Sequence, residues 1–369
     1  MIIMKYLGNF IKLSAVLLFS FSFAQQNRVS RYNADMQASK SYGLQKMELS
    51  SVSKNTYDFM ALGYFINANN NMYLKTKDKK YIDTNISVIK PILIDTNSNT
   101  SYQKNGWVMN VRKGNQNAKA NGQEHLISEG YFFRYIGEFL DILSKNKLYT
   151  NYQPAIESGL KYSFDKWKAR SFSQYGDYSL LFHQRLHTGA NWAVVALYLM
   201  KYDESDKSSY ATFVNQFDQQ LKKALVLNKS TGSILYYTWN STYPDAFCKA
   251  LQKIKNYKPV VQDVSHGNHV VLYLIKAKEL GNANWADFNF SYLCNTLKLK
   301  ILKGNSIADN VDGTTDPSVQ NTGWKISDGW MKLIYFDTSL YPLVEKNLSN
   351  YSNKISNSSL ELQFNSIYP

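Results

Sequence analysis

The chain has 369 residues, a formal net charge of +14 and 44% hydrophobic residues, enough for one large or two ordinary domains with a buried core. Two cysteines, Cys248 and Cys294, exclude a disulfide framework and a structural zinc site, although a single bridge between them stays open. The positive charge favours anionic partners, namely nucleic acid, acidic lipid or acidic polysaccharide, or else marks a merely soluble basic surface.

Residues 1–24 have the pattern of an export signal. Lys5 and Lys12 form a positive flank, an apolar run follows over 14–23, and Ser22-Phe23-Ala24 offers small residues for cleavage. The apolar run is too short to span a bilayer, and no later run is longer. We therefore expect an exported protein, periplasmic or secreted, without stable membrane insertion.

Five segments of the remaining chain have an apolar helical pattern, a short polar turn and a second helical pattern. The first segment covers about 55–93, with its turn at 75–79, and the second begins at Ser128 and resumes at Pro154. The other three begin near Trp192, Val270 and Trp330. Each pair of helices must bury its apolar faces against neighbours, which favours a ring. The pattern predicts an all-α-dominated fold, a complete or incomplete α/α toroid of five to seven helical hairpins.

Between these hairpins lie segments rich in Gly, Asn, Ser and Thr. They cover 97–123, 171–184, 228–243 and 304–324, and some alternate in the manner of short β-hairpin strands, as at 107–111. No proline-rich or charged linker divides the chain, so residues 25–369 are expected to form a single domain and a monomer.

Small polar clusters occupy the starts of four of the five hairpins. They are 128–130, 187–191, 265–269 and 327–329. If the hairpins are arranged alike, the first helices start at the same end of the molecule. The clusters would then converge on one mouth.

The densest cluster is Asp263 to His269. It holds His266, Asn268 and His269 around a glycine at a helix start, where bare N–H groups favour an anion. These groups can bind and activate a substrate, or they can be buried caps of the helix. No carboxylate pattern completes a metal signature with the two histidines, so we expect no metal and no other cofactor.

The second cluster is Arg185 to Trp192. Arg185, His187 and Asn191 can together hold a carboxylate, and Trp192 can stack on a sugar ring. The alternative is a core tryptophan beside a solvated loop histidine.

The remaining candidate residues lie in the second and fifth hairpins and in the loop after the third. Glu129 is either a general acid or a first-turn residue that complements the helix dipole, and Arg134 one turn later would keep it ionised. Both residues are also expected to contact the substrate. Asp328 has the same ambiguity, with Trp330 beside it as a substrate contact. Tyr243, in the loop after the third hairpin, is a candidate proton donor.

Helical hairpins with His, Asn, Trp and Tyr at the starts of inner helices resemble the α/α-toroid polysaccharide lyases, particularly the alginate and glucuronan lyase families. Asn268-His269 resembles the adjacent Asn-His pair that several of them use. The resemblance implies that an Asn with a His or Arg neutralises the uronate carboxylate while a Tyr or His removes the C5 proton. This chain departs from the pattern, because it has no Arg beyond Arg185.

These observations predict a lyase that cleaves an acidic polysaccharide by β-elimination. The expected roles are carboxylate binding by Asn191, His187 and Arg185, proton removal by His266 or His269, and proton donation by Tyr243. Neutralising donors suit this reaction because the carboxylate charge must be offset before C5 loses its proton.

Two other functions stay open. A glycoside hydrolase on the same fold would use Glu129 as acid and Asp328, Asp263 or Asp177 as base. A non-catalytic glycan-binding protein would keep the aromatic residues without a catalytic group. Nucleic-acid binding is not expected, since the chain lacks a recognised motif or a continuous basic helix.

Overall fold

The structure is a computed structural model that describes residues 27–38, 42–112, 115, 118–304, 306–315, 322–355 and 359–368. The expected export signal at 1–24 lies outside these residues. Within them the chain is mostly helical, with residues 27–37 as its first helical turns and two small antiparallel sheets. No helix in this part of the chain is long and apolar enough to cross a membrane.

The α-helices are α2 Leu44–Ser51, α3 Thr56–Thr76, α4 Lys80–Ile89, α5 Tyr102–Asn105, α6 Leu126–Lys145, α7 Gln153–Tyr175, α8 Ser179–Phe182, α9 Leu186–Tyr202, α10 Lys207–Ala224, α11 Lys249–Gln252, α12 Val264–Glu279, α13 Ser291–Thr296, α14 Asp328–Lys332, α15 Leu340–Asn350, α16 Ser352–Ile355 and α17 Leu360–Ile367. The strands are β1 Val226–Lys229, β2 Leu235–Thr238, β3 Leu302–Lys303 and β4 Ser306–Ile307. Single π-type turns at Lys90–Ile94 and Leu297–Ile301 extend α4 and α13.

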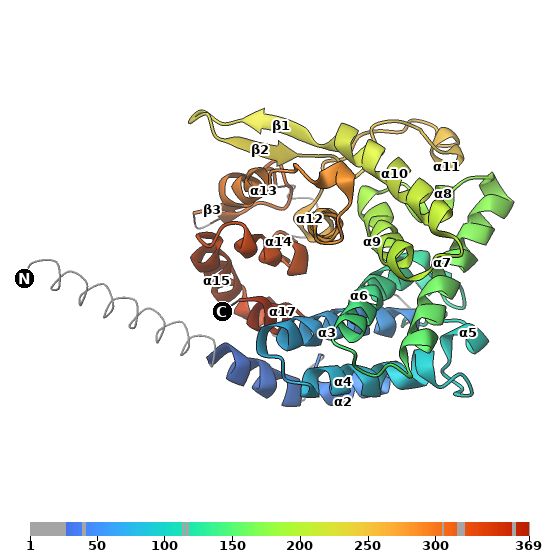
Figure 1. Ribbon diagram of the computed structural model, residues 1–369. Helices are drawn as coiled ribbons and strands as arrows, with labels where there is room; N and C mark the ends of the chain where they lie inside the picture. The colour runs from blue at the N-terminus through green and yellow to red at the C-terminus, as the bar shows by residue number, and fades with distance from the viewer. Residues whose placement is uncertain are drawn as a thin grey trace, which may run out of the picture.

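Six helices of the described chain pack on one another in a closed series. The order is α3, α6, α9, α12, α14 and α17, and α17 packs back on α3. Figure 1 shows this return, with the red C-terminal α17 beside the blue α3. Helices α4, α7 and α10 each pack on the helix that precedes them in the series, on its outer side. We call the six helices the inner helices.

The first three predicted hairpins are confirmed in their main features. The first turns where expected, because α3 ends at Thr76 and α4 begins at Lys80, with Lys77 in left-handed conformation between them. The second pair is α6 and α7, with Pro154 in the first turn of α7. The third pair is α9 and α10. The apolar pattern over 210–227 predicts a helix as far as Leu227, but α10 ends at Ala224 and β1 begins at Val226.

The later hairpins are less regular. In the fifth, α14 has only five residues, and a 3-10 turn continues it through Tyr335. The helix α17, which closes the series, was not expected, although Leu360, Phe364 and Ile367 have helical spacing and are buried. The fold therefore needs one inner helix beyond the five that the pattern indicates.

The short β-hairpins form in or beside two of the expected loop segments, 228–243 and 304–324, but not at 107–111. Residues 107–111 form only isolated bridges, Asn55 with Val108 and Met109 with Asn121. The pairs β1–β2 and β3–β4 form instead, each antiparallel and in loops between helical pairs. Both cysteines are buried and free, so the optional bridge between Cys248 and Cys294 is absent.

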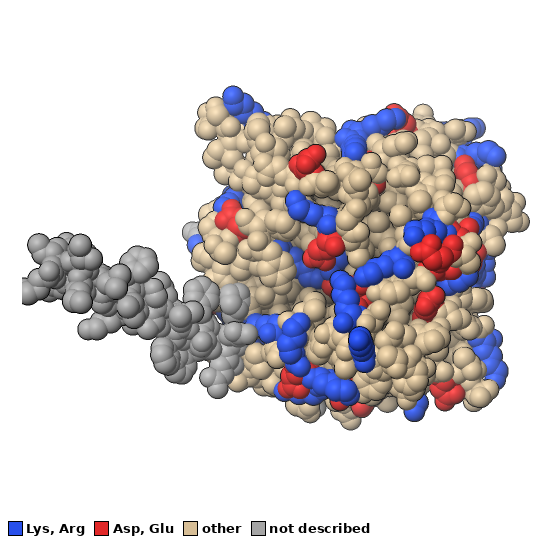
Figure 2. Space-filling view, viewed as in Figure 1, with Lys and Arg blue, Asp and Glu red and all other residues tan. Residues whose placement is uncertain are grey.

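Basic side chains are interspersed with acidic ones over the surface. Figure 2 shows one face on which Lys and Arg lie among Asp and Glu, separated by uncharged residues. Many of these charges are paired, as in the contacts of Lys161 with Asp203 and of Lys201 with Asp141. On this face the positive net charge is therefore not gathered into one continuous basic patch.

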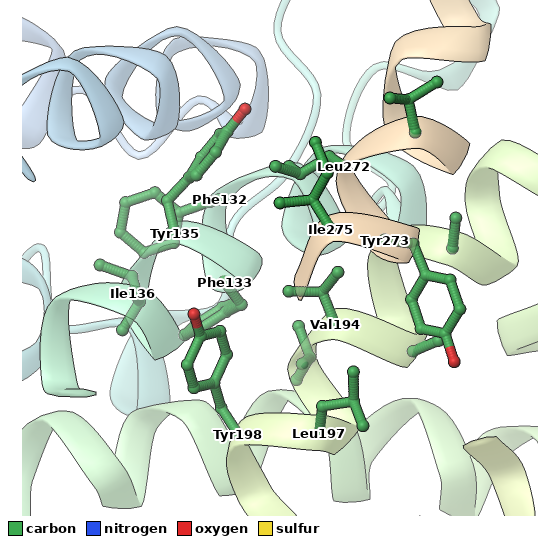
Figure 3. Packing of buried hydrophobic residues seen from close by; sticks show 14 of the residues in the cluster. Phe132, Phe133, Tyr135, Ile136, Val194, Leu197, Tyr198, Leu272, Tyr273 and Ile275 are labelled. Atoms are coloured by element: carbon green, nitrogen blue, oxygen red, sulfur yellow. The ribbon is translucent and has the colours of Figure 1, made fainter. Parts of the chain in front are cut away.

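The core between the inner helices is rich in aromatic residues. Figure 3 shows Phe132, Phe133 and Ile136 of α6 together with Val194 and Tyr198 of α9, and each is at most 2% exposed. The Phe132 ring packs edge to face on Phe59 of α3 and on Trp107. Leu272, Tyr273 and Ile275 of α12 complete the cluster shown there. Burial of such side chains contributes about 1.5 to 3 kcal/mol each.

Helices α12 and α14 approach closely at a glycine. A Cβ atom at Gly329 would lie 2.2 Å from the backbone oxygen of Asn268 and 2.8 Å from the nitrogen of Leu272. Only a residue without a side chain fits there. This close approach brings the starts of the two helices together.

Candidate functional site

The starts of the inner helices meet at one end of the molecule, as the sequence predicts. The imidazole rings of His187 on α9 and His266 on α12 lie 4.3 Å apart. The Asn268 amide on α12 donates to Asp328 on α14 at 2.7 Å. A Cβ atom at Gly130 on α6 would lie 3.1 Å from the Trp192 indole nitrogen on α9. We call this end the histidine end.

A buried polar network lies below the first turns, and Arg134 is its centre. Arg134 is 1% exposed and donates from Nη1 to the Asn191 Oδ1 at 2.7 Å. The same nitrogen contacts His269 Nδ1, and Nη2 donates to the Tyr135 hydroxyl. The Tyr135 hydroxyl in turn donates to Asp328 Oδ2 at 2.7 Å. The guanidinium is thus joined to a carboxylate through one tyrosine.

Asp328 is fixed from four sides. Its carboxylate accepts hydrogen bonds from Asn268 at 2.7 Å and from Asn67 at 3.4 Å, and its backbone N–H donates to Gln363 at 2.8 Å. It is fully buried. Asp328 therefore acts as the internal counter-ion of the network, and the structure does not place it where a hydrolytic base must reach water.

Asn268 has a structural position as well. Its Oδ1 accepts from the backbone N–H groups of Gly329 at 2.6 Å and Trp330 at 3.2 Å, while its amide binds Asp328. All its polar atoms face α14, and it is fully buried. The two residues of the adjacent Asn-His pair therefore have different neighbours, because Asn268 binds α14 while His269 faces Arg134.

The charge of Arg134 is stable inside the network. Burial disfavours its charged form, but the neighbouring Tyr135 and Asp328 outweigh this effect and raise the pKa of the guanidinium above its usual value. Two of its nitrogens have partners, whereas Nε has none. Arg134 was expected to contact substrate directly, but it lies below the surface and acts through Asn191 and His269.

Three histidines form the upper layer of the site. The rings of His187 and His269 lie 6.1 Å apart, and those of His266 and His269 lie 6.3 Å apart. The other two of the five histidines, His125 and His183, stand just before the first turns of α6 and α9. All five therefore belong to the histidine end.

His266 and Asp263 form a dyad at the start of α12. The Asp263 carboxylate accepts from the His266 backbone N–H at 2.9 Å and lies 2.9 Å from its ring Nδ1. The His266 side chain is 47% exposed. In the neutral ring Nδ1–H donates to Asp263, so Nε2 presents its lone pair outward. This is the arrangement of a general base held by a carboxylate.

The surroundings shift the pKa values of these groups. Burial raises the pKa of Asp263, whereas the hydrogen bond and the charge of His266 lower it. The effect of His266 is the larger one, so the pKa of Asp263 is below its usual value. Burial lowers the pKa of His187 well below its usual value, with His266 as a second cause. Burial and then Arg134 do the same for His269. His187 and His269 are therefore neutral at pH 7.

Several buried polar atoms at this end lack a partner. Three of them are Arg134 Nε, His187 Nδ1 and Asn191 Nδ2. An unpaired buried polar group costs about 1 to 3 kcal/mol, so such groups point to a ligand or a bound water. Two of the three, on Arg134 and Asn191, are donors suited to a carboxylate.

Several residues expected to contact substrate are buried elsewhere. Trp192 and Trp330 are fully buried, and the Trp330 indole donates to the Val264 carbonyl at 2.9 Å. Neither offers a face to a sugar, because each fills the space between helices. Arg185 is half-buried at the start of α9 and donates to Ser241 Oγ at 2.6 Å.

Tyr243 is not available as a proton donor. It is 1% exposed, and its hydroxyl donates to the Phe182 carbonyl at 3.0 Å. A Cβ atom at Gly189 would lie 2.3 Å from that hydroxyl, so Tyr243 fills the space that this glycine leaves. Its role is packing behind α9.

Glu129 also lies apart from the histidines. It is fully buried and accepts from Trp167 Nε1 at 2.8 Å, from Ser163 at 3.2 Å, from Lys166 at 2.8 Å and from the Tyr102 hydroxyl. Burial raises the pKa of its carboxyl, and Lys166 opposes this rise. Glu129 therefore joins α6 to the outer α7 and is not an accessible acid. Asp177 likewise accepts the backbone N–H of Ser179 at 2.9 Å as a cap.

The sequence pattern did not single out Tyr131, which faces the histidines. Its ring meets that of His269 edge to face at 4.3 Å, and Arg134 lies 5.1 Å from the ring centre. Tyr131 is 6% exposed, and burial raises the pKa of its hydroxyl. Its position three residues before Arg134, on the same helical face, was the available signal.

Comparison of the chain with protein-family models, with curated proteins and with solved structures finds no match. Among the described residues, no group of three or more His, Cys, Asp and Glu is placed to hold a metal ion.

Proposed function

We propose that this protein is an exported lyase that cleaves an acidic, uronate-containing polysaccharide by β-elimination at the histidine end. The observation that carries the proposal is the Asp263–His266 dyad beside the unpartnered Asn191 amide. The closed series of inner helices supports an α/α toroid as the fold, and the 1–24 pattern supports export.

The uronate carboxylate would bind above Asn191. The free Nδ2 donor of Asn191 lies next to the Arg134 guanidinium, which provides positive charge beneath it. Asn191 is 1% exposed and His187 is 8% exposed, so the His187 ring must rotate to admit the carboxylate. Side-chain rotations of this kind are common on binding. Donors fixed before reaction then offset the carboxylate charge.

His266 would act as the base. Its Nε2 takes the C5 proton, the electron pair of that C–H bond forms the C4–C5 double bond, and the C4–O bond breaks. Asp263 holds the ring in position and stabilises the imidazolium that results. His269 is less suited to this role, since its Nδ1 faces Arg134.

Tyr131 replaces Tyr243 as the proposed proton donor. The leaving oxygen takes the phenolic proton, and the tyrosinate recovers a proton from the His266 imidazolium. Tyr131 lies beside His269 and Arg134, and Arg134 stabilises the transient tyrosinate. The proton balance of the cycle is thus closed within the site.

The hydrolase alternative is less well supported, because its candidate carboxylates are already occupied by other residues. Glu129 and Asp328 are fully buried and hydrogen-bonded, and Asp263 is committed to His266. A hydrolase needs two accessible carboxylates on either side of the scissile bond.

The test is an activity screen of the mature chain on alginate, glucuronan, pectate, hyaluronan and chondroitin. A lyase produces an unsaturated sugar that absorbs in the ultraviolet. We expect His266→Ala to lower kcat by about 10²- to 10⁴-fold. Asp263→Asn should lower it less.

The control for Asp263→Asn is Asp287→Asn, which changes an exposed carboxylate beyond the other end of α12. It should leave kcat unchanged. New reducing ends without ultraviolet absorbance would indicate a hydrolase instead. Binding without any cleavage would indicate a glycan-binding protein.

A further inference from the structure

A pocket lies at the end of the inner helices that is opposite the histidine end. Its volume is about 670 Å³, and all six inner helices contribute to it. This size is in the range of small-molecule sites, about 300 to 1,000 Å³. The pocket is separate from the histidine end, because its lining residues follow the network residues by one or more helical turns. We call it the lysine pocket.

The floor of the lysine pocket holds three charged groups that are almost fully buried. Glu138 is 4% exposed, Lys276 is 5% and Lys332 is 3%. Glu138 Oε1 binds the Lys276 ammonium directly, whereas the Lys332 ammonium lies 3.6 Å from the same oxygen. The distance to Lys332 is longer than a hydrogen bond. Glu279 also binds the Lys276 ammonium, at 2.7 Å, so Lys276 has two carboxylate partners whereas Lys332 has no hydrogen-bonded carboxylate.

Two further atoms on the floor have no partner. Asn71 is 5% exposed and its Nδ2 donor is unsatisfied, and the Glu138 Oε2 acceptor is unsatisfied as well. Leaving such groups unpaired is unfavourable, because each has lost its hydrogen bonds to water. A ligand that accepts from Asn71 and donates to Glu138 would remove both costs.

The electrostatics of the two lysines differ. Burial opposes the charge of Lys276, but Glu138 raises its pKa above the usual value. Burial lowers the pKa of Lys332, and the attraction of Glu138 does not compensate. An anion beside Lys332 would supply the missing stabilisation.

The walls of the pocket are mainly apolar. They include Leu74, Ile142, Leu280, Ile334 and Ile367. Apolar walls over a few polar groups are the usual form of a small-ligand site. Further lysines and acids stand nearer the rim, among them Lys145, whose side chain is 61% exposed.

We propose that the lysine pocket binds a small hydroxylated carboxylate carrying one negative charge. The carboxylate would accept from Lys332 Nζ and Asn71 Nδ2, and a hydroxyl of the ligand would donate to Glu138 Oε2. The ligand carboxylate would supply the hydrogen-bonded partner that Lys332 lacks. This site does not depend on polysaccharide cleavage at the histidine end.

The experiment uses the mature chain and three probes of equal chain length, read by isothermal titration calorimetry. Gluconate has the carboxylate and the hydroxyls, glucitol lacks the carboxylate, and hexanoate lacks the hydroxyls. Gluconate should bind at least about tenfold more tightly than either of the others, since each lacks one of the matched groups. Absence of gluconate binding, or equal binding of glucitol, would overturn the proposal.

Variants locate the site. Lys332→Met and Asn71→Leu should each weaken gluconate binding at least about tenfold, with circular dichroism that stays helical. Lys145→Met, at the rim, is the matched control and should bind as the unmodified chain does. If Lys332→Met does not fold, Asn71→Leu alone decides. His266→Ala should leave gluconate binding unchanged. Loss of gluconate binding in this variant would place the gluconate site at the histidine end and overturn the proposal.

Discussion

Arg134 and Glu138 lie four residues apart on α6, and both reach across to α12, where Arg134 contacts His269 and Glu138 contacts Lys276. The same four-residue step separates Asn67 from Asn71 on α3 and Asp328 from Lys332 on α14. Residues at this spacing lie one above the other on a helix, about 6 Å apart. The interior between the inner helices therefore has two polar layers, and each faces a different end of the molecule.

Glu129 tests the lyase proposal against hydrolysis. Glu129→Gln should destabilise the fold by about 1 to 3 kcal/mol, because the amide cannot accept from all the donors around it. Lyase activity per folded molecule should stay unchanged, measured with urea unfolding and the ultraviolet assay. Glu204→Gln, at a side chain that is 74% exposed, is the control and should change stability little. If the unmodified chain forms reducing ends without ultraviolet absorbance and folded Glu129→Gln does not, the hydrolase reading is supported.

Glu138 should make stability depend on pH. Burial opposes its charge, but Lys276 and Lys332 lower its pKa from 4.5 to about 2. Because the folded pKa is the lower one, this stability is present above pH 4.5 and is lost as the pH falls through about 2. The loss amounts to about 3 kcal/mol.

Urea unfolding across this pH range measures the effect. The unmodified chain should lose more stability than Glu138→Gln does on acidification. Glu279→Gln, at a side chain that is 48% exposed, should behave like the unmodified chain. Parallel curves for the unmodified chain and Glu138→Gln would contradict the assignment.

His187 and His269 should resist protonation. Burial lowers the pKa of both below the usual 6.5, and His266 and Arg134 respectively add to the effect. Their ring signals in nuclear magnetic resonance should therefore stay those of neutral imidazole at pH 6. The unfolded chain takes up these protons more readily, so the contribution of the two rings to stability is present above pH 6.5 and falls below it. Titration of either ring at or above pH 6.5 would show that it is solvated.

Gly329 should be intolerant of a side chain. In Gly329→Ala the Cβ would meet backbone atoms of α12 at 2.2 Å and 2.8 Å, and backbone cannot rotate away. We expect a loss of about 1 to 3 kcal/mol or more in thermal or urea unfolding. Gly232→Ala, where the nearest atom is a side-chain oxygen at 4.0 Å, is the control. Equal stability of the two variants would mean that α12 and α14 do not approach as described.

The sequence predicts where the main helices lie, but it does not predict which of their side chains are exposed. Apolar spacing indicates α3, α6, α9 and α12, because a helical face that packs on neighbours must repeat with the helix. The same spacing cannot distinguish a tryptophan on the mouth from one between helices. Trp192 and Trp330 are therefore in the core, although both follow polar clusters at helix starts.

The site shows the same division. His187, Asn191, His266 and His269 meet because inner helices that run the same way bring their starts together, and the sequence suffices to predict this. Glu129 faces the outer α7 instead, since one step around a helix turns a side chain by about 100°. The local sequence does not specify which neighbour a given face meets.

The sequence by itself determined the helical hairpins and the polar clusters at their starts, because both follow from local periodicity and capping. Only the tertiary structure decided that α17 returns to α3, that Arg134 and Asp328 share one buried network, and that Asn71, Glu138 and Lys332 form the floor of the lysine pocket. These relationships join residues that are far apart in the chain, and their positions depend on how whole helices pack.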